Sequence, residues 1–232
     1  MLRNIMTTPA IPIWVHSLAD YRLMFDLDDK ALNKTILDYP AGISCFNAQW
    51  HAQGPNNVVS ADPYYDLAPL DMMKHVDFVI QELSEKLDHY LHLLQPAGEK
   101  EIENLLNVWN QYAQIFLADY SDGQQEGRYR AAKLPTLPFK DQEFELGLCS
   151  NLLFRERHYS AETIVSELAR VAQEVRIFPL LDQNGEIAKD LGPIMLLLQQ
   201  KNFGVEVKTV PYTLMKKSNA MLRFWSKECV VL

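Results

Sequence analysis

Residues 35–65 contain two apolar runs that each end in a carboxylate, with a glycine turn and a short helical segment between them. The first run ends at Asp38 and the second at Asp62, and Gly42 lies in the turn after the first. This order is typical of a nucleotide-binding βαβ unit, because the helix after the turn presents unpaired N–H groups over it. A carboxylate after the second strand can accept hydrogen bonds from a ribose diol. The segment therefore predicts an α/β fold with a parallel sheet.

The alternation of strand and helix continues through the rest of the chain. The last two expected strands have no helix between them, only a turn around 214–218, so they should pair as an antiparallel hairpin. We therefore expect a Rossmann-like, mostly parallel sheet of seven strands, flanked by helices, with an antiparallel C-terminal hairpin strand. Strands are expected at 35–38, 58–62, 127–131, 144–149, 175–181, 205–210 and 219–226, and helices at 13–25, 44–53, 160–173 and 192–201.

Between the second and third expected strands the pattern changes to long amphipathic helices. Apolar residues recur at steps of three and four from 70 to 94 and from 102 to 116, on either side of a break at 95–98. Two such helices are longer than a parallel crossover requires. We interpret residues 1–232 as one domain with a helical hairpin inserted at 66–126, and the favoured role of the hairpin is a lid or an oligomer contact.

Composition narrows the class of protein. A chain of 232 residues with 48% hydrophobic content can bury a large core, and no stretch approaches the ~18 apolar residues of a membrane span. The net charge of −8 argues against a broad nucleic-acid-binding face. Pro9 and Pro12 beside the first apolar stretch do not suggest a secretory signal, and three widely spaced cysteines do not suggest a disulfide framework or a metal site. We expect a cytoplasmic protein with no metal.

Several motifs along the chain form one pattern: 36–38 with 41–42, Asp62, 137–139 leading into 144–149, 150–154, and 167–178. In these motifs the chain resembles the class I S-adenosylmethionine-dependent methyltransferases, from about residue 20 to 227 with the helical hairpin as an interruption. The sheet of that family has seven strands with the seventh inserted antiparallel. The resemblance therefore implies this fold, S-adenosyl-L-methionine as the cofactor, and methyl transfer as the activity.

The resemblance also implies a role for individual residues. Asp38 would meet the amino group of the methionine moiety, Gly42 would allow close approach of the backbone, and Asp62 would accept hydrogen bonds from the ribose. Arg22 would bind the methionine carboxylate as a bidentate donor. The remaining implied contacts are Pro40, Ala41 and Ser44 in the first turn, Pro63 and Tyr64 beside the adenine, Ala132, Lys133 and Leu134 near the adenine ring, and Ser150 and Asn151 for cofactor or substrate.

Departures from the family pattern keep other functions open. Pro40 and Ser44 stand where the first motif usually has glycines, and Ala132 and Lys133 stand where an acid usually meets the adenine amino group. A catalytically degenerate binding or scaffold protein that uses the hairpin as a partner surface is one alternative. A nicotinamide-dependent oxidoreductase is another, but the turn lacks a Gly-x-Gly-x-x-Gly pattern, and Asp38 precedes the glycine where it would repel a pyrophosphate.

The acceptor is not encoded in an obvious motif. Methyl transfer from a sulfonium requires alignment and exclusion of water more than acid–base help, so the acceptor could be a small molecule or a protein side chain. If the acceptor must lose a proton, His158 and Tyr159 are the candidate catalytic bases, on position alone. A homo-oligomer formed through the hairpin is a further expectation.

Overall fold

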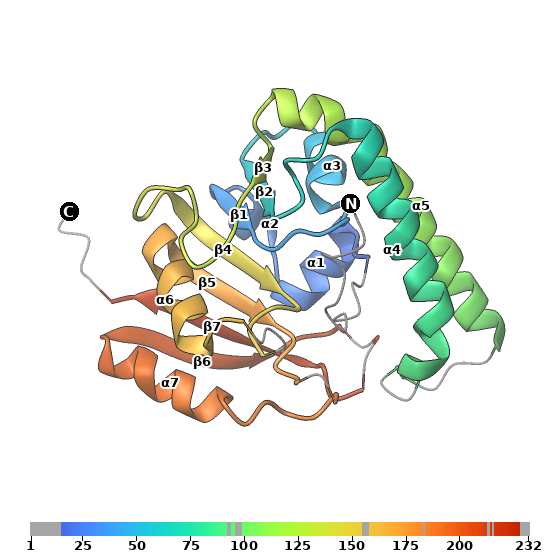
Figure 1. Cartoon of the computed structure of the whole chain (residues 1–232). Helices are drawn as coiled ribbons and strands as arrows, with labels where there is room; N and C mark the ends of the chain where they lie inside the picture. The colour runs from blue at the N-terminus through green and yellow to red at the C-terminus, as the bar shows by residue number, and fades with distance from the viewer. Residues whose placement is uncertain are drawn as a thin grey trace.

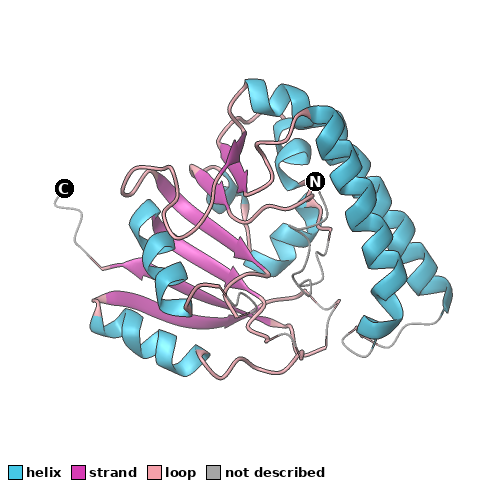
Figure 2. Ribbon diagram, viewed as in Figure 1, coloured by secondary structure: helices cyan, strands magenta, loops and turns pink. Residues whose placement is uncertain are grey.

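A computed structural model of the chain has at its centre a twisted seven-stranded sheet covered by helices (Figures 1 and 2). The structure describes residues 15–91, 94–95, 99–154, 158–182, 184–212, 214 and 216–227. The strands are β1 (Ile36–Asp38), β2 (Val58–Asp62), β3 (Tyr129–Ala131), β4 (Phe144–Ser150), β5 (Ala172–Phe178), β6 (Phe203–Thr209) and β7 (Ala220–Ser226).

The strand order is β3-β2-β1-β4-β5-β7-β6. The neighbouring pairs from β3 to β5 are parallel, whereas β7 lies antiparallel to both β5 and β6. The last strand is thus inserted antiparallel between two strands that run with the rest of the sheet. The mostly parallel seven-stranded sheet expected from the sequence is confirmed.

Helices cover both faces of the sheet (Figure 1). On one face α1 (Leu18–Phe25), α2 (Asp29–Leu32) and α3 (Phe46–His51) share a buried apolar cluster with β1, β2 and β4. On the other face α6 (Ala161–Val171) packs against β4 and β5, and α7 (Leu191–Gln200) packs against β6 and α6. Both faces of the sheet are therefore shielded from solvent, as is usual for a central parallel sheet.

Two long helices, α4 (Pro69–Tyr90) and α5 (Glu99–Gln125), connect β2 to β3 and lie side by side (Figure 1). Their buried faces form one cluster with residues that follow other strands, among them Ile43 after β1 and Leu181 after β5. The backbone N–H of Gln95 donates to the carbonyl of Leu214, in the connection from β6 to β7, at 3.0 Å. The hairpin therefore packs along the carboxyl ends of the strands.

The base of the hairpin is held by a buried ion pair. The guanidinium of Arg128 donates to both carboxylate oxygens of Asp119 on α5, at 2.6 and 2.8 Å, and also to Asn47 of α3. Tyr129 of β3 donates its hydroxyl to the same Asp119 at 2.8 Å. These charge-assisted bonds fix α5 to β3 and α3, so the hairpin is anchored where it rejoins the sheet.

Several element bounds differ from the sequence expectations. The helix expected at 160–173 ends at Val171 and the strand expected at 175–181 begins at Ala172, because Ala172 already pairs with Phe144 of β4. That strand ends at Phe178, before Pro179, which has no N–H to donate. The helix expected from residue 13 begins at Leu18, where Ser17 forms a capping box; residues 13 and 14 lie outside the described residues.

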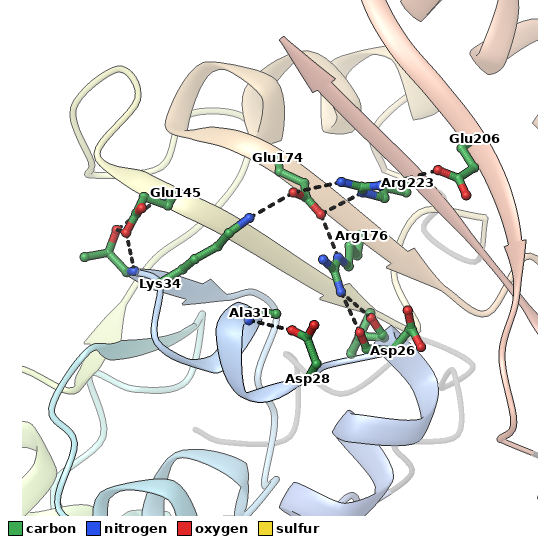
Figure 3. A network of polar contacts seen from close by, with 11 residues as sticks. Asp26, Asp28, Ala31, Lys34, Glu145, Glu174, Arg176, Glu206 and Arg223 are labelled. Atoms are coloured by element: carbon green, nitrogen blue, oxygen red, sulfur yellow. Dashed lines mark hydrogen bonds and ion pairs between the residues drawn. The ribbon is translucent and has the colours of Figure 1, made fainter. Parts of the chain in front are cut away.

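A charge network on the sheet is centred on Glu174 of β5 (Figure 3). Its carboxylate, 7% exposed, binds Arg176 and Arg223 at 2.8 Å and Lys34 at 3.0 Å. Arg176 also donates to the carbonyls at the end of α1, Phe25 and Asp26. Burial raises the pKa of Glu174, but the hydrogen bonds and charges of its cationic partners outweigh burial and lower the pKa to about 2. The network thus ties β5, β7 and α1 together.

We expect Glu174→Gln to lower the free energy of unfolding by about 3 kcal/mol at pH 7, because it leaves the buried Arg176 and the partly exposed Arg223 and Lys34 without this counter-charge. Urea denaturation measures this change. Glu206→Gln is the matched control: Glu206 is more exposed and lies 3.4 Å from Arg223, so its loss should cost less than ~1 kcal/mol. Since the folded pKa of Glu174 is depressed, its stabilisation is present above about pH 4.5 and is lost as pH falls toward about 2. Equal destabilisation by both variants would contradict this account.

Candidate functional site

A cavity of about 200 Å³ opens at the carboxyl ends of β1, β2 and β4. Its walls are the segments that follow these strands, 40–43, 62–65 and 150–152, together with Met72 and His75 of α4. The chain winds outward in opposite directions from the neighbours β1 and β4, which makes their junction the switch point of the sheet. Open α/β sheets bind ligands outside the strand ends at such a point.

Asp62 ends β2 and shapes the cavity through two backbone hydrogen bonds. Its Oδ2 accepts from the N–H of Gly42 at 2.9 Å, and its Oδ1 accepts from the N–H of Tyr64 at 3.0 Å. Gly42 has a φ of +57°, a left-handed conformation that favours glycine. The hydroxyl of Tyr65 donates to the carbonyl of Gly42 at 2.7 Å. The turn after β1 is therefore fixed on both sides by residues that follow β2.

The carboxylate of Asp62 is 5% exposed, and burial raises its pKa to about 6 although the two N–H donors oppose the change. Each oxygen has one backbone partner, whereas an ionised carboxylate has about four acceptor positions. Two acceptor positions therefore remain for hydroxyl groups of a ligand.

Asp38 ends β1 but does not line the cavity. It is fully buried, and its oxygens accept from the hydroxyl of Tyr21 at 2.8 Å and from that of Ser60 at 3.1 Å. Burial raises its pKa to about 7, against the effect of these two donors. Asp38 joins α1, β1 and β2 behind the cavity wall.

The structure brings together most of the residues expected in the first turn and after β2 and β4. Ser44 is an exception, because its hydroxyl donates to the carbonyl of His16 and accepts from the N–H of Phe46. The expected residues that line the cavity are Pro40, Ala41, Gly42, Asp62, Pro63, Tyr64, Ser150 and Asn151.

Other expected residues lie elsewhere. Ala132 and Leu134 are buried in the cluster with the sheet, and Lys133 is exposed; none of the three lines the cavity. Arg22 forms an ion pair with Asp29 at 3.0 Å on the surface of α1. An expected ligand of the cofactor carboxylate is thus engaged in a local pair away from the cavity.

The two expected bases are also outside this cavity. His158 is exposed, and the hydroxyl of Tyr159 donates to the carbonyl of Leu134 at 2.8 Å. Tyr159 lines a separate shallow hollow together with residues at the start of α6 and α7, including Glu162 and Asp190. The geometry therefore assigns neither residue a proton transfer in the cavity.

Sequence reasoning missed the contribution of helix α4. Met72 and His75 are one turn apart and both line the cavity, and the ring of His75 stacks on Tyr64 with centroids 4.3 Å apart and an interplanar angle of 27°. Burial lowers the pKa of His75, which keeps its ring neutral at pH 7. The amphipathic pattern predicted the helix, but no local signal indicates that this helix reaches back over the strand ends.

A buried histidine supports the opposite wall. His16 Nε2 lies 3.3 Å from the side-chain amide of Asn151, a non-glycine residue with a φ of +55°. Burial lowers the pKa of His16 to about 4, and its Nδ1 has no hydrogen-bond partner within the described part of the chain. A neutral imidazole therefore holds the amide of Asn151 in place at the cavity.

These residues fit the nucleoside part of S-adenosylmethionine. Asp62 keeps acceptor capacity for ribose hydroxyls, the backbone at Gly42 can approach a ligand closely, and Tyr64 offers a planar ring to a base. Among the described residues that line the cavity there is no lysine or arginine. The carboxylate end of such a ligand would have to rely on neutral donors.

Two further features concern metals and membranes. In the part of the chain that the structure describes, no group of three histidine, cysteine or acidic side chains is placed to hold a metal ion. None of the described helices combines the length and the apolar character needed to cross a bilayer.

Comparisons with known proteins found relatives at low identity. No family model matches the chain. An uncharacterized protein of Methanocaldococcus jannaschii is 28% identical over 221 residues, which cover 88% of this chain and 90% of that protein.

Solved structures with similar folds are described as methyltransferases. A SAM-dependent methyltransferase from Thermotoga maritima has a TM-score of 0.45 and 10% identity, with 94% of this chain and 92% of that chain covered. One from Aquifex aeolicus has a TM-score of 0.40 and 14% identity, covering 88% and 91%. The 1,6-didemethyltoxoflavin-N1-methyltransferase of Burkholderia thailandensis, with S-adenosylhomocysteine bound, has a TM-score of 0.41 and 15% identity, covering 84% and 72%.

The strand order and the antiparallel β7 decide the fold. The chain has the class I methyltransferase fold. Similarities at this level of identity and TM-score say nothing about the acceptor or the activity, so the functional argument rests on the cavity itself.

The raised pKa of Asp38 predicts how the stability of the protein depends on pH. Its folded pKa of about 7 exceeds the ordinary value of 3.8, so its stabilisation is present below about pH 4 and is lost as pH rises through about 7. Asp38→Asn keeps an acceptor for Tyr21 but cannot ionise. The quantity of interest is the free energy of unfolding of the variant minus that of the unsubstituted protein. We expect this difference to increase by about 2 kcal/mol between pH 5 and pH 8, because only the unsubstituted protein loses stability as Asp38 ionises.

Urea denaturation at a series of pH values measures this difference. Asp66→Asn, at an exposed carboxylate near the same strand ends, is the control variant. A difference for Asp38→Asn that stays constant from pH 5 to pH 8 would show that Asp38 titrates normally.

Proposed function

We propose that this protein is an S-adenosylmethionine-dependent methyltransferase that acts on a small molecule or a protein side chain. The observation that carries the proposal is the cavity at the switch point of the sheet, where Asp62 keeps two free acceptor positions beside the glycine turn at Gly42. A ribose diol supplies two hydroxyl donors, which matches that free capacity.

In this proposal the residues of the chain bind and orient the cofactor and the acceptor, and none of them forms a covalent bond with either. Asp62 holds the ribose, Gly42 admits the ligand to the backbone, and the amide of Asn151, held by His16, offers a polar contact on the β4 side. S-adenosylmethionine supplies the methyl group on a sulfonium, which needs an aligned nucleophile and a site without water. Because His158 and Tyr159 lie outside the cavity, we propose an acceptor that is already nucleophilic at neutral pH.

A non-catalytic binding or scaffold protein on the same fold is the second candidate. The cavity has no cation among its described lining residues, Arg22 is paired with Asp29, and Asp38 is fully buried and does not line the cavity. These features weaken the expected binding of the carboxylate end of the cofactor, which favours a protein without catalysis. A nicotinamide dinucleotide is disfavoured more strongly, since its pyrophosphate would lie beside Asp62 with no positive charge to balance it.

Calorimetric titration with S-adenosylmethionine, S-adenosylhomocysteine and NAD tests the ligand class. We expect both sulfur ligands to bind and NAD to give no heat. Asp62→Ala should weaken binding by about 100-fold, because it removes two hydrogen bonds to a charged group. Asp66→Ala is the matched control and should bind like the unsubstituted protein, since Asp66 is exposed and does not line the cavity.

The outcomes separate the candidate functions. Circular dichroism and thermal melting establish that each variant is folded before it is titrated. No binding of either sulfur ligand by folded protein would exclude the methyltransferase. Binding without formation of S-adenosylhomocysteine, in incubations with panels of small amines, hydroxyls, thiols and peptides, would favour the scaffold protein.

A further inference from the structure

One wall of the cavity is contributed by helix α4 and not by the sheet. Met72 and His75 are three residues apart and lie on one side of this helix, facing the cavity. His75 is stacked on Tyr64, which is 41% exposed at the mouth of the cavity beside Asp62. A thioether and two planar rings are therefore gathered next to the carboxylate that is proposed to hold a ribose.

The sheet does not supply the corresponding wall from β3. Ala132 and Leu134, which follow β3, are packed into the apolar cluster on the sheet, and the exposed Lys133 does not line the cavity. The ring and sulfur side chains in the lining are Tyr64, Tyr65, Met72 and His75, and Tyr65 is engaged with the carbonyl of Gly42. Tyr64, Met72 and His75 are therefore the partners left for the base of a nucleoside whose ribose is bound at Asp62. This differs from the contacts expected from the sequence.

We infer that His75, together with Tyr64, holds the purine base of the ligand, so that the helical hairpin forms part of the binding site. The inference rests on the proposed function, because it takes the ribose to lie at Asp62. Stacking suits these partners, since a purine, an imidazole and a phenol ring all present flat polarizable faces. Met72 is fully buried and also lines the cavity, and a thioether is a favourable neighbour for an aromatic ring.

The measured stack restricts how the base can pack. The rings of Tyr64 and His75 are 4.3 Å apart, whereas a base between them would need roughly 7 Å, two van der Waals separations. A base therefore cannot lie between the two rings, and the inference places it against the part of the pair that lines the cavity. His75 is half-buried and its ring is held by Tyr64, so little side-chain freedom is lost on binding.

Three variants on α4 test the inference by titration with S-adenosylhomocysteine and with adenosine alone. His75→Ala should weaken both ligands by about tenfold, because one stacking partner is removed. His75→Phe keeps a planar ring and should restore binding to within about threefold. Asp77→Ala, an exposed position two residues further along the same helix, is the control and should leave both affinities unchanged.

A second readout reports directly on the ring. The C2 proton of His75, assigned by its absence in His75→Phe, should shift in NMR spectra on addition of adenosine and should not shift on addition of homocysteine. This measurement uses the unsubstituted protein, so it decides the question even if His75→Ala fails to fold.

The outcomes distinguish the inference from the proposed function. If the unsubstituted protein binds neither ligand, both fail. If it binds S-adenosylhomocysteine and His75→Ala binds as tightly as Asp77→Ala, with no shift of the C2 proton, the base lies elsewhere and only the inference is overturned.

Discussion

Two buried carboxylates at the ends of adjacent parallel strands organise the site. Asp62 accepts the N–H groups of Gly42 and Tyr64, and so joins the turn after β1 to the turn after β2. Asp38 accepts from Tyr21 and Ser60 and so holds α1 against the same strands. Burial of these groups raises the pKa of each, which means that ionisation opposes folding near neutral pH. The hydrogen bonds offset part of that free-energy cost, and they fix the turns that form the cavity walls.

The hairpin adds a wall to a site that the sheet alone would leave open at the carboxyl ends of its strands. A class I sheet leaves the carboxyl ends of its strands accessible, but here α4 and α5 lie along them and bury aromatic side chains against the turn residues (Figure 1). The rings of Tyr65, Phe116, Tyr120 and Tyr129 pack with centroids 5.3–5.8 Å apart. Together with the Arg128–Asp119 pair, this packing gives α4 a defined position relative to Asp62. A ligand that touches α4 therefore meets a wall fixed by the core.

Local sequence could predict the sheet but only half of the site. The apolar runs that end at Asp38 and Asp62 indicate parallel strands, because strand-end polar residues and glycine turns are local features. The absence of a helical pattern between the last two strands likewise predicted their antiparallel pairing. By contrast, the positions of Arg22 and His75 depend on side-chain contacts that the apolar pattern does not indicate, the ion pair of Arg22 with Asp29 and the stack of His75 on Tyr64. Helical periodicity gives which face of α4 is buried and cannot give what lies beneath it.

The distribution of charge bears on which ligand the cavity prefers. Every described arginine is engaged with a carboxylate, as in the pairs of Arg128 with Asp119 and of Arg176 with Glu174, and no cation is left at the cavity lining. A site next to Asp62 and Asp38 that lacks compensating positive charge repels phosphates and attracts cations. The sulfonium of S-adenosylmethionine is a cation, whereas the thioether of S-adenosylhomocysteine is not. In the proposed function the same imbalance would therefore favour the methyl donor over the demethylated product and would lower the pKa of both carboxylates when the donor is bound.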